Sequence, residues 1–296
     1  YKDPVLTKDI MNKYFAKYTF EDLTKMINVN ELRDAYYYNI LKKNGMDEVV
    51  GDFKQSQRGE ASITGDCYWL SAFKSLSSTD AGKALIEKIM DGPFEDENGK
   101  YYLYTFEGSF RAKTNNKSDT SNYIKEQTPI KVYFTDLIDS MQSGNKYSTG
   151  DATMRGFEIA LSKHLQETLY TNDPTARTDD DGYISNGQLM FTMHVLLGNY
   201  CRNTQFTSDK ETFKNAMIKA INNGTIDNLV ITFGFRGHAR GITKVTEAGF
   251  TYVDPMDTKN GVYTMTWEQF MASNETYNIQ WADITASSSS YYNDWY

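Results

Sequence analysis

Apolar residues follow two spacings along the chain, and the two spacings predict different elements. Four-residue spacing predicts helices within residues 1 to about 50 and over 81–90, 152–170, 188–197 and 213–222. Short apolar runs predict strands at 101–106, 130–134 and 229–235. The last run is apolar almost throughout, as expected of a central strand. The chain is therefore expected to combine helices with strands.

One stretch joins a glycine, a thiol and the start of a helix. Gly65-Asp66-Cys67 precedes an apolar stripe at helical spacing, made of Trp69, Leu70, Phe73 and Leu76. Cys67 then falls in the first turn of a helix, where free N–H groups and the positive end of the helix dipole favour the nucleophilic thiolate. The alternative is a structural Cys67, because free cysteines are commonly buried as small hydrophobes.

A second stretch predicts a β-hairpin that carries a histidine and a carboxylate. The segment 236–244 runs out and 250–255 returns, around the turn residues Glu247-Ala248-Gly249. With a five-residue loop at 245–249, Arg240 lies opposite Asp254, and His238 reaches Asp254 diagonally on the same face. A four-residue loop would place the two side chains on opposite faces. Asp254 could also be a turn residue before proline.

The sequence therefore contains the three residue types that thiol catalysis requires. A nucleophilic thiol needs a base within hydrogen-bond reach, and the base needs an acceptor that fixes its tautomer. Cys67, His238 and Asp254 can fill these roles. The other two histidines have plainer explanations, with His194 as a core residue of a buried helix and His164 as a surface residue.

Composition excludes several classes of protein. The net charge of −8 makes nucleic acid an unsuitable partner, and the lack of a long uncharged apolar run predicts no membrane span. Cys67 and Cys201 cannot form a disulfide framework, and a bridge between them would consume the nucleophile. The many Tyr residues and few Cys are typical of exported bacterial proteins, so a secreted or cell-surface location is expected. Oligomeric state is left open.

An acidic run at 179–181, followed by Gly182, is the one stretch similar to a calcium loop. With Gly182 at loop position 6, Arg177 takes position 1 and Gln188 position 12, where such a loop needs Asp and Glu. A solvated acidic turn is the preferred interpretation, and a weak calcium site of another geometry is the alternative. No metal or other cofactor is expected.

These motifs resemble those of a known family. Gly65-Asp66-Cys67-Tyr68-Trp69-Leu70 resembles the nucleophile motif of calpain-like cysteine peptidases, and Gly237-His238-Ala239 resembles their histidine motif. Thr266-Trp267-Glu268-Gln269-Phe270 resembles the segment after their third catalytic residue. The similarity extends from about residue 53 to 282. It implies an α+β, papain-like fold of two lobes, with Cys67 on a helical lobe and His238 and Asp254 on an antiparallel β-rich lobe.

Two positions depart from the family pattern. The family places Asn before Pro-Trp-Gly, whereas this chain has Asp254-Pro255-Met256-Asp257. A carboxylate also orients an imidazole and favours its protonated form. The family's oxyanion-stabilising Gln stands six residues before the Cys, where this chain has Ala61. Losing one such donor costs about 100- to 1000-fold in rate, and Gln57 is the expected substitute.

The resemblance implies a cysteine endopeptidase that acts on protein or peptide substrates through a Cys67 acyl-enzyme. Two other functions are carried as alternatives. A transglutaminase-like acyl transferase on the same fold would use the same three residues, and an inactive binding or surface protein would explain Ala61 and Met256. Many calpains need calcium, but their ligands have no matched positions here.

The resemblance also suggests three segments. Residues 1–52 form an N-terminal helical segment, either an integral layer, which we favour, or a pro-segment. Residues 53–284 form the peptidase domain, and 285–296 form a flexible C-terminal tail.

Overall fold

The fold combines helices with small and large antiparallel sheets. The computed structural model describes residues 29–46, 53–54, 57–58, 62–63, 66–106, 109–110, 123–124, 128–142, 148–168, 176–178, 184–187, 192, 195–196, 204–257 and 261–285. Its α-helices are α3 (Val29–Lys43), α4 (Cys67–Leu76), α5 (Asp80–Ile89), α6 (Phe134–Gln142), α7 (Ala152–Thr168), α9 (Lys210–Asn222) and α10 (Trp267–Ala272). Every strand pair formed by these residues is antiparallel. The expected α+β class is thus confirmed.

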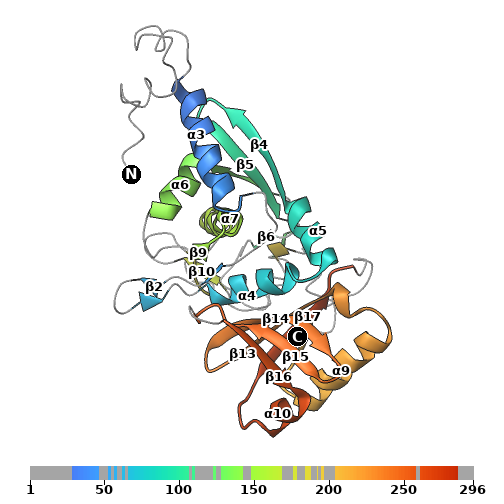
Figure 1. Ribbon diagram of the computed structural model, residues 1–296. Coiled ribbons are helices and arrows are strands. Elements are labelled where there is room, and N and C mark those ends of the chain that lie inside the picture. The colour runs from blue at the N-terminus through green and yellow to red at the C-terminus, as the bar shows by residue number, and fades with distance from the viewer. Residues whose placement is uncertain are drawn as a thin grey trace.

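The largest sheet has six strands in the order β12-β17-β13-β14-β15-β16. These are β12 (Thr204–Thr207), β13 (Leu229–Phe235), β14 (His238–Thr246), β15 (Gly249–Val253), β16 (Val262–Thr266) and β17 (Asn278–Asp283). In Figure 1 this sheet occupies one end of the molecule with α9 and α10, while α3, α6 and α7 lie at the other end. Helix α4 lies between the two groups and packs on β13 and β14.

The second sheet has three strands in the order β4-β5-β8, formed by β4 (Met90–Asp96), β5 (Gly99–Phe106) and β8 (Thr128–Tyr133). The remaining strands pair in twos: β1 (Phe53–Lys54) with β9 (Thr149–Gly150), β2 (Gln57–Arg58) with β3 (Ser62–Ile63), β6 (Ser109–Phe110) with β7 (Tyr123–Ile124), and β10 (Ala176–Thr178) with β11 (Ile184–Gly187).

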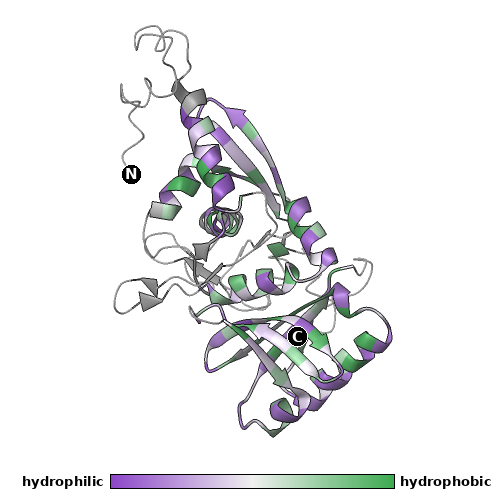
Figure 2. Cartoon of the chain, in the orientation of Figure 1, coloured by the Kyte–Doolittle hydropathy of each residue, from purple (hydrophilic) through white to green (hydrophobic). Residues whose placement is uncertain are grey.

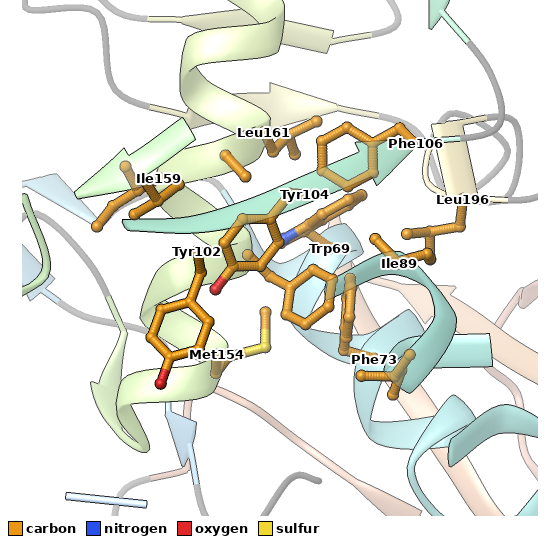
Figure 3. Close-up of a cluster of buried hydrophobic side chains, with 14 of the residues drawn as sticks. Trp69, Phe73, Ile89, Tyr102, Tyr104, Phe106, Met154, Ile159, Leu161 and Leu196 are labelled. Atoms are coloured by element: carbon orange, nitrogen blue, oxygen red, sulfur yellow. The ribbon is translucent and has the colours of Figure 1, made fainter. Parts of the chain in front are cut away.

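The main hydrophobic core lies where α4, β5 and α7 meet. Trp69 and Phe73 project from α4, and their ring centroids are 4.8 Å apart. Phe73 also contacts Phe157 of α7, at 4.6 Å. Figure 3 shows these α4 side chains facing the aromatic residues of β5, Tyr102, Tyr104 and Phe106. The stripe predicted after Cys67 is therefore buried, but so are Tyr68, Ser71 and Ser75, and α4 is covered on more than this one side.

The two faces of the six-stranded sheet pack against different helices. Val230 of β13 and Ala239 of β14 belong to the core around α4. Ile231 and Phe233 of β13 point to the opposite face, into a second core formed with α9 and α10. This two-residue alternation follows from the pleat of a strand, and it makes β13 buried on both sides, as its apolar sequence predicted. Figure 2 shows hydrophilic beside hydrophobic positions on α5 and α9, as expected of helices with one buried side.

Most predicted elements within the described residues are confirmed, with small shifts at their ends. The prediction for 81–90 is α5, that for 152–170 is α7, and those for 101–106 and 130–134 are β5 and β8. Strand β4, which follows α5 directly, was not predicted. The acidic run 179–181 lies outside the described residues, as does most of the expected helix at 188–197.

The prediction of an exposed His164 was wrong. His164 is fully buried, and its ring lies 5.5 Å from that of Phe106, centroid to centroid. Helix α7 is covered on more than one side, because α6, β8 and the β6 strand all contact it. Polar neighbours in the sequence therefore did not indicate exposure.

The described part of the N-terminal segment packs on the same core as α4. Tyr37, Leu41 and Met46 are buried in it, and the Asn44 carbonyl accepts a hydrogen bond from Ala152 N at 2.7 Å. Whether residues 1–52 are an integral layer or a pro-segment stays a prediction. Residues 286–296, nearly all of the predicted tail, lie outside the described residues. Within the described residues, none of the helices has the length and apolar character to cross a bilayer.

Candidate active site

Helix α4 begins at Cys67, as the sequence predicted, and is held tightly against the sheet. Gly241 of β14 faces the α4 backbone, and a Cβ added there would lie 2.2 Å from the Ser71 carbonyl oxygen. One turn further along the helix, the Ser75 hydroxyl accepts a hydrogen bond from Ile231 N at 2.8 Å. Contacts to two adjacent strands therefore fix the position of the helix that carries the thiol.

Cys67 is a half-buried free thiol beside the strand that carries the histidine. Backbone N–H groups of Ala239 and Tyr68 donate hydrogen bonds to its sulfur. Because Ala239 directly follows His238 along β14, this contact places the sulfur next to the histidine position. The packing of α4 on β14 thus brings residues 67 and 239, far apart in sequence, into contact.

His238 is the first residue of β14, directly after a two-residue turn. Arg236 and Gly237 have φ angles of 53° and 71°, as a type I′ hairpin turn requires at both central positions. Phe235 of β13 pairs with His238 across this turn. The turn therefore fixes the backbone at the histidine.

The β14–β15 hairpin reaches the predicted pairing by a different route. The loop is shorter than the five residues assumed, because Thr246 pairs with Gly249 around a two-residue turn. A register shift between Ile242 and Lys244 then restores the pairing of Gly241 with Val253. Continuing this register by one residue places Arg240 opposite Asp254. The loop length assumed from the sequence was wrong, and the bulge at Thr243 compensates for it.

His238 and Asp254 form a short hydrogen bond, as the sequence predicted. His238 Nε2 lies 2.6 Å from Asp254 Oδ1, which also accepts from Met256 N at 2.9 Å. The second oxygen, Oδ2, accepts from Arg240 Nε at 2.8 Å. The side chains of His238 and Asp254 are only 11% and 14% exposed. The described hydrogen-bond partners of the Asp254 carboxylate therefore lie on β14 and in the turn that follows β15.

The charge of Asp254 is maintained despite its burial. Burial acts to raise the pKa of this carboxyl, but the hydrogen bond and charge of His238, the Met256 N–H and the charge of Arg240 together hold the pKa below its ordinary value. An ionised carboxylate only accepts hydrogen bonds, so His238 Nε2 carries the shared proton. Nδ1 is then the imidazole nitrogen that can act as a base.

The Tyr68 N–H at the start of α4 lowers the pKa of the Cys67 thiol, as expected of a helix N-terminus, but burial has the larger effect. Burial raises the pKa of the Cys67 thiol to about 11, and the negative charge of Asp66 acts in the same direction. The Ala239 and Tyr68 N–H groups and the charge of Arg240 oppose this but are weaker. At neutral pH the thiol therefore keeps its proton until a base removes it.

A second buried carboxyl group supports the start of α4. Glu158 of α7 accepts hydrogen bonds from Ser148 N at 2.9 Å and from the Ser148 hydroxyl. Burial raises the pKa of Glu158, although hydrogen bonds from Asp66 and Ser148 partly oppose this. Asp66, the N-cap residue of α4, is itself fully buried. The acids Asp66 and Glu158 thus join the start of α4 to α7.

The sequence analysis singled out Cys67, His238 and Asp254 but not the residues around them. Arg240 and Glu158 were not identified as site residues. A signal for Arg240 was present, because the predicted register already placed its positive charge opposite Asp254.

The expected oxyanion donor Gln57 lies on β2, where it pairs with Ile63 of β3. Its role stays a prediction. Among the described residues there is no group of three or more His, Cys, Asp and Glu side chains arranged to hold a metal ion. The calcium alternative concerned the acidic run at 179–181, outside those residues. Compared with models of known protein families and with curated proteins, the chain matches none.

Proposed function

We propose that this protein is a cysteine endopeptidase with Cys67 as nucleophile, His238 as general acid and base, and Asp254 as the residue that orients the imidazole. The observation that carries the proposal is the 2.6 Å hydrogen bond between His238 Nε2 and Asp254 Oδ1. The residue after His238 on the same strand, Ala239, donates its N–H group to the Cys67 sulfur. We further propose that the fold is papain-like, with α4 on one lobe and the six-stranded sheet on the other, and that the protein is secreted or cell-surface.

The first chemical step transfers a proton and forms a bond. His238 Nδ1 takes the proton of the Cys67 thiol, and the sulfur attacks the carbonyl carbon of a peptide bond. The carbonyl oxygen becomes an oxyanion, which the Cys67 backbone N–H can stabilise because the first N–H groups of a helix have no intrahelical acceptor. Gln57 is proposed as the second donor.

The intermediate then collapses, and the C–N bond breaks as the imidazolium gives its proton to the departing amine. This leaves a thioester on Cys67. Water attacks the thioester while His238 Nδ1 accepts a proton from it, and the thiol leaves with a proton returned from the imidazolium. The products are an amine and a carboxylic acid, and the enzyme regains its resting protonation.

A covalent inhibitor of the papain type tests this proposal. We expect it to modify Cys67 in the native protein, and peptide cleavage to be abolished in Cys67→Ala and His238→Ala. Cys201→Ser is the matched control, because it removes the other thiol and should leave labelling and cleavage intact. Cleavage that survives in Cys67→Ala would overturn the assignment.

One observation favours a non-catalytic alternative. The pKa of about 11 at Cys67 means that a resting thiol without an effective base would be inert, as in an inactive protein that has retained the fold. Such a protein would show slow labelling of Cys67 and no effect of His238→Ala on the labelling rate. An acyl transferase of the transglutaminase type would instead incorporate a primary amine into a Gln-containing protein without cleaving the chain.

A further inference from the structure

Arg240 is a charged side chain that several separate contacts hold in place. Its Nε donates to Asp254 Oδ2 at 2.8 Å, and its Nη1 donates to the His238 carbonyl oxygen at 3.0 Å. Its guanidinium carbon lies 3.8 Å from the centroid of the Phe235 ring, a distance typical of a stacked cation–π contact. With 12% of the side chain exposed, the orientation of the guanidinium is well defined.

These contacts determine how the Asp254 carboxylate is oriented. A carboxylate can rotate about its terminal bond and exchange its two oxygens, so a single hydrogen bond to His238 would not fix its plane. Arg240 holds Oδ2 while Met256 N and His238 share Oδ1. The carboxylate is therefore bound at both oxygens, with the Oδ1 lone pair directed at the imidazole.

We propose that Arg240 is a positioning residue of the catalytic site, which holds Asp254 in the rotamer and the charged state that orient His238. This inference rests on the proposed peptidase function for its kinetic consequence. Its structural consequence, the strength of the hydrogen bond between His238 and Asp254, can be measured without any activity.

The titratable groups around Asp254 allow a clear pH experiment. His238 and Arg240 lie on β14, Tyr252 on β15 and Tyr263 on β16. The pKa of Tyr252 is raised by burial, and that of Tyr263 is raised to about 12 by its hydrogen bond to Asp257. Neither tyrosine ionises below neutral pH. The two tyrosines therefore do not contribute to the acid limb of the activity profile.

Arg240→Met keeps most of the side-chain length and removes both the charge and the donors. Because Arg240 does not contact the reacting atoms, we expect kcat to fall about 10- to 100-fold while KM stays unchanged, the range seen when outer partners of a site are lost. Without the neighbouring cation, Asp254 binds a proton more readily. The acid limb of kcat/KM should therefore move to higher pH.

Proton NMR supplies the test that is independent of activity. In the unmodified protein, the His238 Nε2 proton should appear as a downfield signal that is absent in His238→Ala. We expect Arg240→Met to lose this signal and Arg240→Lys, which restores the charge without the planar donor, to recover it only in part. Lys131→Met is the matched control, because Lys131 is exposed and pairs with Asp96 on the three-stranded sheet; it should leave the signal unchanged.

The outcomes separate the two proposals. An unchanged downfield signal and acid limb in Arg240→Met would overturn the positioning role, even if the protein were less stable. If Arg240→Met does not fold, the same two measurements on Arg240→Lys decide, and values identical to the unmodified protein would overturn it. If the signal changes as expected but no variant or parent cleaves peptides, the positioning role stands and the peptidase proposal fails.

Discussion

At Gly241, an added methyl group should push α4, which carries Cys67, away from β14, which carries His238. A Cβ added there would lie 2.2 Å from Ser71 O, 3.1 Å from Ser71 C and 3.3 Å from Ser71 Cα. All three atoms belong to the α4 backbone, so no side chain can rotate away. Restoring an ordinary contact of about 3.4 Å requires α4 and β14 to move apart by on the order of 1 Å.

Gly241→Ala should therefore affect both stability and catalysis. Overpacking at a tight contact costs about 1–3 kcal/mol, which urea unfolding can measure. Cys67 lies one helical turn before Ser71, so a shift of α4 also moves the sulfur away from Ala239 and His238. A displacement of about 1 Å at a catalytic group can lower the rate about 100-fold. The loss should appear in kcat/KM for a peptide and in the rate of Cys67 alkylation.

Gly234→Ala is the matched control for this experiment. It lies on β13, next to β14, and an added Cβ would meet the carbonyl oxygens of His238 and Asn278 at 3.6 and 3.9 Å. Both are ordinary contacts, so we expect nearly unchanged stability and activity. If Gly241→Ala behaves like Gly234→Ala in unfolding, kcat/KM and alkylation, the close packing of α4 on β14 does not position the thiol, and the reasoning is refuted.

Two further predictions concern the contacts that hold α4. Ser75→Ala leaves the buried N–H of Ile231 without its acceptor and should lower the free energy of unfolding in urea by about 1–3 kcal/mol. Ser77→Ala removes only a hydrogen bond within its own helix turn and should lower it much less. Equal losses in the two variants would contradict this prediction. Because the pKa of Glu158 is raised above its ordinary value of 4.5, the folded state binds the extra proton, and stability should fall as pH rises from 4.5 through the raised value. Glu158→Gln can still accept from Ser148 N and should remove this fall from the stability–pH curve, and an unchanged curve would show that Glu158 does not cause it.

The sequence predicted well the features that local patterns determine. Apolar spacing located α5, α7 and β13 because each has at least one buried side, and the buried apolar positions recur at the spacing of a helix or a strand. The pairing of Arg240 opposite Asp254 was also correct, but for an incomplete reason. A two-residue turn and a bulge at Thr243 together give the register that a five-residue loop would give, and no local pattern marks the bulge.

Features that depend on distant parts of the chain could not be predicted in this way. His164 has polar neighbours in sequence, yet Phe106 of β5 lies against its ring. The pKa of Cys67 is set by burial, which arises only when α4 packs on β14. The local sequence predicts that this thiol lies at a helix N-terminus, but it does not predict how far folding buries the thiol. Here the loss of solvent has the larger effect.

The balance of effects at Cys67 determines which residues should matter most for the proposed reaction. The pKa of about 11 means that a preformed thiolate is not the resting state. Proton transfer to His238 must then accompany attack, and its efficiency depends on where Nδ1 points. That direction is set at the opposite edge of the ring, where Nε2 donates to Asp254. Since Arg240 in turn binds the second oxygen of Asp254, we expect changes at these two residues to lower the rate more than changes to the helix dipole of α4.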